Sequence, residues 1–283
     1  MAPSFPTTIL IAHDAFHKAS AYDTLATHLA TFDLRTIVPQ LPSASRCSPP
    51  DPFAADTAMF HNAVVAELMT GHNVVVLAHG YGGLPGCEAL QHLPLRSSKA
   101  GIGRILGIIF VAAFVAEEGE SFATAMEGGQ PEWCDDMEGA VANISDHATA
   151  TTLFNTVSNP RDRAEYATHL TAQALDVFNT DVTYAGWEDY RTVSIHCTRD
   201  NSQPADAQDH FDRKLWRGAD DHLGHQELES DHCPHVSMPE TLAHKVAMIK
   251  EVFKMLVREE RMKRMEVKEM KEMEEMKEMK KVR

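Results

Sequence analysis

The chain has 283 residues, of which 43% are hydrophobic and 24% charged, a composition typical of a globular protein with a sizeable core. Its formal net charge of −15 at pH 7 repels phosphate backbones, so we expect no nucleic-acid partner. No apolar run reaches the roughly 18 residues of a membrane span, so we expect no membrane partner either. The N-terminus lacks the pattern of a signal peptide and the five cysteines show no CxxC spacing, which together predict a cytoplasmic protein.

The first part of the chain alternates short apolar runs with helical patterns. In chain order, the periodicity predicts a strand at 7–13, a helix at 19–32, a strand at 34–38, a helix at 56–71, a strand at 73–79, a helix at 81–93 and a strand at 105–114. The strands at 73–79 and 105–114 are apolar almost throughout, as expected of strands that are covered on both faces. This alternation predicts the α/β class, with a doubly wound, mostly parallel sheet.

The β-α rhythm stops between residues 117 and 187, where helical stretches are short and strand character is low. We predict that 117–187 forms a helical cap inserted into a core made of 1–116 and 188–257. The sheet pattern then resumes, with a strand at 192–197, a helix at 205–216, a possible strand at 226–228 and a closing helix at 239–257.

The tail at 258–283 has a different composition. Its Glu and Lys residues interleave at helical spacing, which favours an extended, solvated helix. Its methionines recur mostly every third residue, which does not match the alternating steps of three and four in a coiled-coil seam. We therefore assign this charged tail no chemistry.

The most informative motif follows the strand at 73–79. There the chain reads His79-Gly80-Tyr81-Gly82-Gly83, and small residues flank the turn at Ala78 and Gly82. This strand–turn–helix layout is that of a nucleophile elbow, whose small flanks allow the two backbones to approach closely. The central residue of such an elbow is strained. Gly80 accepts that conformation easily, but it has no side chain to attack with.

The elbow resembles that of the α/β-hydrolase superfamily, particularly small esterase-like members of fungi and bacteria and the methylesterase and hydroxynitrile-lyase branch, where it usually reads H-S-Y-G-G. The resemblance extends over 7–257 and implies an α/β-hydrolase fold in which the nucleophile position, Gly80, is vacant. Thr198–Pro204 matches the family pattern E-R-D-N-x-x-P, which carries the acid to Asp200. Ser230–Glu240 is similar to G-H-S-P-x-x-S-x-P-E, which carries the catalytic histidine to His232.

A third match follows the first predicted strand, where His13-Asp14-Ala15-Phe16-His17 is similar to the H-G-A-W-H of relatives. The resemblance implies that the backbone amides of Ala15 and Tyr81 form the oxyanion hole. It also implies a pocket lined by Asp14, Phe16, His17 and His79. Asp14 stands where relatives have glycine, and a carboxylate that faced the pocket would oppose the negative charge of an oxyanion.

These residues leave acid–base chemistry as the preferred function. Without a hydroxyl at Gly80 no acyl-enzyme can form there, and losing a triad serine costs on the order of 10⁶ in kcat. An Asp200–His232 pair still supplies a general base. We therefore expect an enzyme that acts on a small apolar metabolite by a lyase, cyclisation, isomerisation or water-activated hydrolysis reaction. The resemblance implies a setting in secondary metabolism.

Two alternatives remain open: a non-catalytic pseudo-hydrolase that binds a ligand, and a serine esterase disabled at Gly80. Metal chemistry is not expected. Five residues near the C-terminus have spacings seen in zinc sites, namely His222, His225, His232, Cys233 and His235. However, the chain has 16 histidines, so chance pairs are common, and no matching Cys/His pair with finger spacing exists elsewhere. We predict no metal, no cofactor and a small-molecule partner, and the sequence leaves the oligomeric state open.

Overall fold

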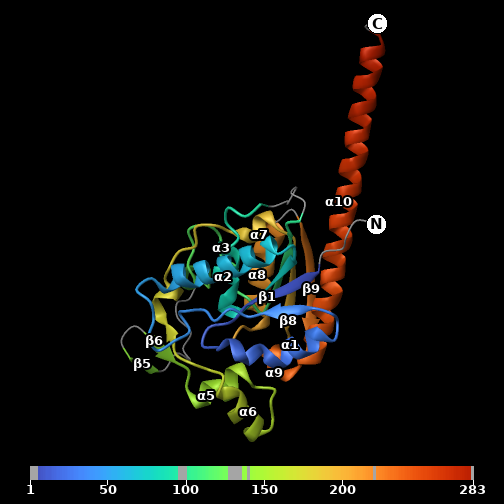
Figure 1. Ribbon diagram of the computed structural model, residues 1–283. Coiled ribbons are helices and arrows are strands. Elements are labelled where there is room, and N and C mark those ends of the chain that lie inside the picture. Colours follow the sequence, from blue (N-terminus) through green and yellow to red (C-terminus); the bar gives the residue numbers. More distant parts are fainter. Residues whose placement is uncertain (1–5, 95–100, 127–135, 139–140, 219–220, 282–283) are drawn as a thin grey trace.

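A computed structural model describes residues 6–94, 101–126, 136–138, 141–218 and 221–281. One six-stranded sheet runs through the body of the protein, with helices on both sides (Figure 1). In sheet order the strands are β2 (Arg35–Ile37), β1 (Thr7–Ala12), β3 (Asn73–His79), β4 (Ile105–Val111), β8 (Thr192–Cys197) and β9 (His222–Leu228). Every pairing in this sheet is parallel. The predicted α/β class with a doubly wound parallel sheet is therefore confirmed.

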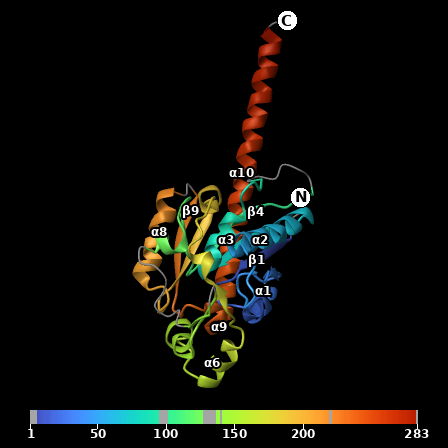
Figure 2. The ribbon, with the colours of Figure 1, turned by 90° about the vertical axis from the view of Figure 1, so that its left-hand side faces the viewer.

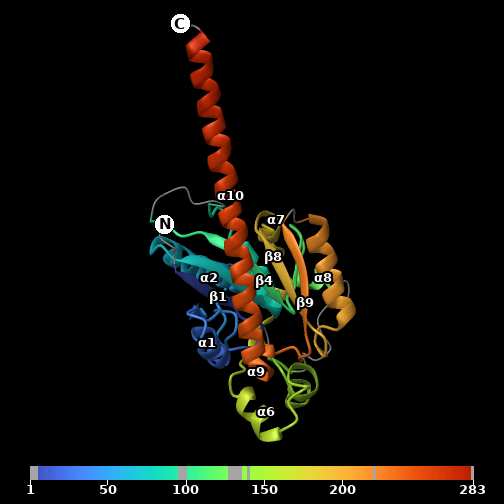
Figure 3. The ribbon, with the colours of Figure 1, turned by 90° about the vertical axis from the view of Figure 1, so that its right-hand side faces the viewer.

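Side chains alternate between the two faces of the sheet. On β3, Val74 and Val76 pack in one core cluster, with α2 (Pro52–Met69), α3 (Gly83–Glu88) and α8 (Ala205–Gly218), whereas Val75 and Leu77 pack in the other, with α1 (Asp23–Ala30) and α10 (Pro239–Lys281). Figure 2 shows α2 and α3 in front of the sheet, and Figure 3 shows α10 crossing the opposite face. Burial on both faces explains why the strand reads as a continuous apolar run.

Strand boundaries agree with the prediction to the residue in some strands and differ in others. β3 and β8 have the predicted bounds, whereas β4 ends at Val111, before the predicted residue 114. The chain leaves the sheet because Ala112 adopts a positive φ of 38° and the amide of Phe114 donates to the carbonyl of Gly80 instead (3.0 Å). β9 begins at His222, four residues earlier than predicted. It is an edge strand with mostly polar side chains, which conceal the strand pattern.

The observed helix boundaries differ from the predicted ones in several places. The predicted helix at 19–32 is a short 3-10 segment, η1 (Ala19–Tyr22), followed by α1. The predicted helix at 81–93 is likewise η2 (Gly80–Gly82) followed by α3. α2 begins at Pro52 rather than at residue 56, because the Asp51 side chain accepts from the amide of Ala54 (3.1 Å) and proline suits the first helical position.

We predicted a helical cap at 117–187, but this segment contains strands as well as helices. Its helical elements are α4 (Phe122–Ala125), α5 (Asp146–Ala148), a short π-helix η3 (Thr149–Leu153), α6 (Pro160–Ala167), the 3-10 segment η4 (Leu175–Phe178) and α7 (Gly186–Asp189). It also contains a small antiparallel sheet of β5 (Asp136–Glu138), β6 (Val141–Asn143) and β7 (Gln173–Ala174). Strands of two or three residues are too short to show alternation in a sequence. In Figure 1, α5 and α6 lie below the main sheet, near α9 (Pro234–Ser237).

The closing helix and the charged tail form one continuous helix, α10, of 43 residues. Its first half packs on the sheet and its second half projects away from the body (Figures 1 and 3). Every side chain from Met262 to Lys277 is exposed, including the methionines. None of the helices in the described part of the chain combines the length and the apolar character of a membrane span.

Shortening the chain to end at Arg261 removes the exposed side chains of residues 262–277 with the residues that follow them, and it keeps the ion pair between Arg191 and Glu260. We therefore expect the free energy of unfolding in urea to change by less than about 0.5 kcal/mol. Phe253→Ala, on the buried half of α10, serves as the contrast and is expected to lose about 3–5 kcal/mol. A truncated chain as unstable as Phe253→Ala contradicts the view that the tail contributes nothing to the fold.

Candidate active site

Four loops meet at the carboxyl edge of the sheet. Asp14 follows β1, Gly80 follows β3, Asp200 follows β8 and His232 follows β9. Parallel strands place all their carboxyl ends at one edge, which is where ligands bind in open α/β sheets. Residues that are far apart in the chain are thereby brought into contact, and all four are buried.

His232 and Asp200 form a hydrogen-bonded pair. Nδ1 of His232 lies 2.7 Å from Oδ2 of Asp200. The other carboxylate oxygen, Oδ1, accepts from the backbone amides of Ser202 (2.7 Å) and Gln203 (2.8 Å). Both oxygens of Asp200 are therefore held, and the carboxylate in turn fixes the orientation of the imidazole.

Asp14 occupies the space on the other side of His232. Its Oδ2 lies 3.1 Å from Nε2 of His232, and its Oδ1 accepts from the backbone amide of Tyr81 (2.7 Å). The sequence-based expectation was that the Tyr81 amide would bind an oxyanion, which the Asp14 carboxylate would oppose. In the structure the Tyr81 amide donates to the Asp14 carboxylate itself, so this amide is already occupied.

Gly80 makes room for that carboxylate. It is the first residue of η2, directly after β3, and has a φ of +50°, in the left-handed region where residues with a side chain are strained. A Cβ at residue 80 would lie 1.9 Å from Oδ1 and 2.2 Å from Cγ of Asp14. A side chain at residue 80 and the observed position of the Asp14 carboxylate therefore exclude each other.

His79 supports the loop that carries His232. Its Nε2 donates to the backbone carbonyl of His232 (2.7 Å), so its Nδ1 accepts from the Tyr22 hydroxyl (2.6 Å). The same hydroxyl accepts from the amide of Asp14 (3.1 Å). Burial lowers the pKa of His79 to about 3, so its imidazole is neutral. The sequence predicted that His79 lines the pocket, whereas its contacts in the structure are those of a positioning residue. Tyr22 joins His79 to Asp14, but in the sequence it was only one apolar position of a predicted helix.

Tyr81 is anchored by a buried carboxyl group that the sequence did not single out. Its hydroxyl donates to Oδ2 of Asp56 (2.8 Å). Ser43 donates to the same carboxyl group through its hydroxyl (2.5 Å) and its amide (2.8 Å). Burial raises the pKa of Asp56 to about 6 although these hydrogen bonds oppose the shift. Asp56 lies on α2 among helix-forming residues, and nothing in the local sequence pattern indicates that its side chain is buried.

The remaining predicted pocket residues connect the loop after β1 to the segment 117–187. The amide of Phe16 donates to the side chain of Gln173 (3.1 Å), and its carbonyl accepts from the amide of Thr171 (2.7 Å). Nδ1 of His17 bonds to the carbonyl of Ala15 (2.8 Å). Ala15, Phe16 and His17 are all buried. This loop is thus held by the segment 117–187 as well as by the sheet.

The charges at the centre of the site stabilise one another. Burial by itself raises the pKa of Asp14, but the hydrogen bond and the positive charge of His232 outweigh burial and hold this pKa well below its usual range. Burial by itself lowers the pKa of His232, but Asp200 and Asp14 together raise it well above its usual value. The central contact is therefore between a carboxylate and an imidazolium.

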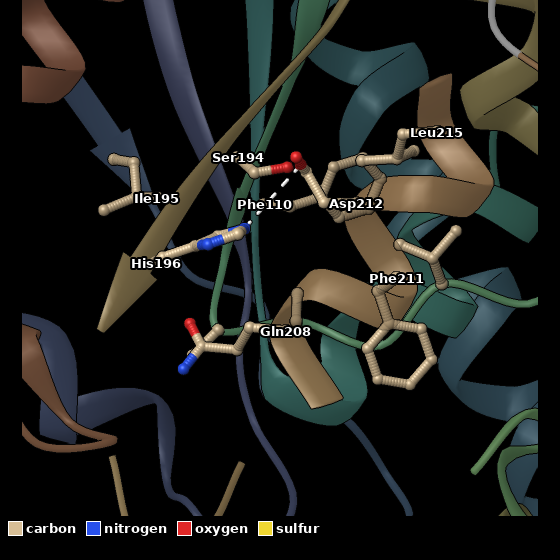
Figure 4. A pocket seen from close by; sticks show the side chains of 11 residues that line it. Phe110, Ser194, Ile195, His196, Gln208, Phe211, Asp212 and Leu215 are labelled. Carbon is tan, nitrogen blue, oxygen red and sulfur yellow. Dashed lines mark ion pairs between the residues drawn. The ribbon is translucent and has the colours of Figure 1, made fainter. Parts of the chain in front are cut away.

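The five residues with zinc-like spacing separate in the structure. His222 and His225 lie on the edge strand β9, where both approach Asp212 on α8 (3.4 and 3.0 Å). Figure 4 shows Asp212 and His196 facing each other in the pocket between β8 and α8. His232, Cys233 and His235 lie instead at the candidate active site.

Three groups of described side chains bring potential metal-ligating atoms within 4.8 Å of one another: His196, Asp212 and His225; Asp14, His79 and His232; and His17, Cys233 and His235. In the first group the rings of His196 and His225 stack at 4.3 Å and 6°, so their in-plane lone pairs run parallel and do not converge on one ion. In the second group all four ring nitrogens are already hydrogen-bonded.

The fold and this constellation agree with comparisons to known proteins. A family model described as "Alpha/beta hydrolase family" matches residues 9–245. "Probable hydrolase R7" of Phoma sp. is 29% identical over 245 residues, covering 84% of this chain and 96% of that protein. "Alpha/beta hydrolase nvfD" of Aspergillus novofumigatus is 23% identical over 240 residues, covering 84% and 94%. The chain belongs to the alpha/beta hydrolase family.

Solved structures show the same fold. A pyrethroid hydrolase from Sphingobium faniae JZ-2 superimposes with a TM-score of 0.66 at 19% identity, covering 88% of this chain and 98% of that one. Polyneuridine aldehyde esterase gives a TM-score of 0.67 at 18% identity, covering 87% and 100%. The predicted α/β-hydrolase fold is thereby confirmed.

The clash between residue 80 and Asp14 predicts strong coupling between the two positions. Gly80→Ser alone forces the carboxylate away from the Tyr81 amide and is expected to cost about 1–3 kcal/mol of stability. In an Asp14→Gly background the same substitution meets no carboxylate and should cost at least about 1 kcal/mol less. Urea unfolding of the wild type, both single variants and the double variant measures this coupling energy. Additive effects contradict the geometry.

The raised pKa of Asp56 predicts a specific pH dependence of stability. Because the folded protein holds this proton more tightly than the unfolded chain, stability falls as the pH rises from the ordinary value of 3.8 to about 6. The total effect is at most about 3 kcal/mol. Asp56→Asn removes the titration, so the difference in unfolding free energy between wild type and variant should change across this window and be flat above it. A constant difference from pH 4 to pH 7 rejects the assignment.

Proposed function

We propose that this alpha/beta hydrolase-family protein is an enzyme that transfers protons on a small apolar metabolite without a serine nucleophile. Asp14 accepts a proton, His232 donates one, and Asp200 orients His232. The observation that carries the proposal is the position of the Asp14 carboxylate, between the imidazole of His232 and the amide of Tyr81. The proposed chemistry uses this chain's own residues.

Two departures from the hydrolase pattern support this proposal because they compensate each other. Gly80 offers no hydroxyl to form an acyl-enzyme, and its missing Cβ leaves the space that the Asp14 carboxylate fills. A site that had merely lost its serine has no need for a second acidic group hydrogen-bonded to His232. The retained Asp200–His232 pair then orients a histidine toward Asp14 rather than toward a hydroxyl.

The contact suits reactions in which a proton leaves one atom and another is added nearby. A general acid and a general base 3.1 Å apart serve both sides of an isomerisation, an elimination or a cyclisation. A substrate carbonyl that displaced Asp14 from the Tyr81 amide would receive a hydrogen bond as negative charge develops on its oxygen. Hydrolysis by a water activated at the same pair is a further possibility within this class.

An apolar substrate is supported by the aromatic side chains beside the polar centre. The ring of Phe178 lies 6.4 Å from that of Phe16 and 6.0 Å from that of Tyr81, measured between centroids. Phe122 packs against Phe178 at 5.0 Å. A role in secondary metabolism and a cytoplasmic location stay predictions from the sequence.

Removing either proton-transfer group should abolish turnover while ligand binding survives. Small molecules that co-purify with the full chain are identified by mass spectrometry, and each is then incubated with wild type, His232→Ala and Asp14→Asn. We expect turnover to fall by about 10²–10⁴ in both variants. His225→Ala removes an exposed histidine on β9 and serves as the matched control with unchanged turnover.

The alternatives give different results in the same experiment. A ligand-binding pseudo-hydrolase shows binding without turnover in the wild type. A disabled serine esterase shows no chemistry in the wild type, but the Asp14→Gly/Gly80→Ser variant cleaves p-nitrophenyl esters and carries the trapped acyl group on the new serine. Turnover by the wild type that is unchanged in Asp14→Asn would falsify the role of Asp14.

A further inference from the structure

A cluster of soft and borderline metal-ligating groups lies beside the proton-transfer residues and takes no part in their chemistry. His17 comes from the loop after β1, Cys233 directly follows His232, and His235 lies on α9. All three cluster residues are at most 1% exposed. One potential ligand atom from each lies within 4.8 Å of the other two.

The distances in this cluster match those between ligands of one tetrahedral zinc ion. Nε2 of His17 lies 3.6 Å from Sγ of Cys233. A zinc ion with bonds of about 2.0 Å to nitrogen and 2.3 Å to sulfur places these two atoms about 3.5 Å apart. The rings of His17 and His235 have centroids 5.3 Å apart and planes at 71°. Two imidazoles on one tetrahedral zinc have centroids about 5.2 Å apart.

The hydrogen bonds orient the ligand atoms toward one point. His17 donates to the carbonyl of Ala15 through Nδ1, so its Nε2 lone pair faces Cys233 and accepts from the thiol, whose proton a metal ion would replace. A backbone partner of this kind orients the metal-binding histidines of known sites. Among the residues that the structure describes, neither ring nitrogen of His235 has a hydrogen-bond partner, although the ring is buried and stacked on Tyr22 at 4.1 Å. An imidazole buried without partners is costly, and a metal ion would satisfy it.

The local charge also favours a cation. Asp14 and Asp200 lie on either side of one imidazolium, which leaves this buried region with a net negative charge. Burial lowers the pKa values of His17 and His235, so both imidazoles are neutral, the form that binds metal. A cavity lined by Val236 and residues of η1 and α6 reaches one of the three cluster residues, His17.

We propose that His17, Cys233 and His235 form a binding site for Zn²⁺. Binding converts the Cys233 thiol to a thiolate and releases its one proton to the solvent. Zn²⁺ and the thiolate together then add one positive charge beside the group of Asp14, His232 and Asp200, which has a net negative charge. Thiolate and imidazole together select Zn²⁺ over harder cations. The inference departs from the expectation that the chain binds no metal. It is independent of the proposed function, because both ring nitrogens of His232 stay with Asp200 and Asp14.

The site is tested on the full chain after dialysis against a chelator. We expect one equivalent of Zn²⁺ to bind and to raise the melting temperature, because the ion joins the loops after β1 and β9 only in the folded state. Co²⁺ in place of Zn²⁺ should give tetrahedral d–d bands and thiolate-to-cobalt absorption. In Cys233→Ser this absorption disappears and Zn²⁺ affinity falls by at least about 100-fold.

Matched variants separate this site from other thiols and histidines. Cys197→Ser removes another buried cysteine, and His225→Ala removes a histidine of the Asp212 cluster; both should bind Zn²⁺ as the wild type does. His235→Gln, with its fold checked by circular dichroism, tests the site if Cys233→Ser does not fold. Absence of thiolate absorption in the wild type, or equal Zn²⁺ affinity in Cys233→Ser and Cys197→Ser, overturns the proposal.

Discussion

The hydrogen bond between Asp14 and His232 is the interaction on which the rest of the site depends. Two groups that are each costly to bury in charged form become stable because they face each other at 3.1 Å, with Asp200 completing the line. The amide of Tyr81 holds the second oxygen of Asp14, and the absent Cβ of Gly80 leaves the space for it. The Tyr81 amide, the His232 imidazole and the space at Gly80 all serve the Asp14 carboxylate.

Around this centre, neutral histidines serve as rigid connectors. Nδ1 of His13 donates to the carbonyl of Asp14 (2.8 Å) while Nε2 accepts from the amide of Leu41 (2.9 Å), and burial lowers its pKa to about 4. His79 joins Tyr22 to the carbonyl of His232 in the same way. An imidazole that donates on one side and accepts on the other satisfies two buried groups at once. His13 and His79 thus hold the loops around the site in place, whereas His232 has the proposed acid–base role.

The fold could be predicted wherever a strong periodic signal was present. The buried strand β3 was located to the residue, because a strand covered on both faces needs apolar side chains at nearly every position. Only the last three residues of the edge strand β9 were predicted, because many of its side chains are polar and exposed and the strand therefore lacks an apolar run. The small sheet within 117–187 was missed for a different reason, since its strands are too short to carry a pattern.

The sequence by itself determined the α/β class, the turn at Gly80, and Asp200 and His232 as candidates, because these depend on local periodicity and on motifs read along the chain. Only the tertiary structure decided what Asp14 does and which groups surround Cys233. Asp14 and His232 are separated by 218 positions, and no local preference links them. Their contact exists because parallel strands deliver loops from both ends of the chain to one edge of the sheet, where distance in sequence no longer matters.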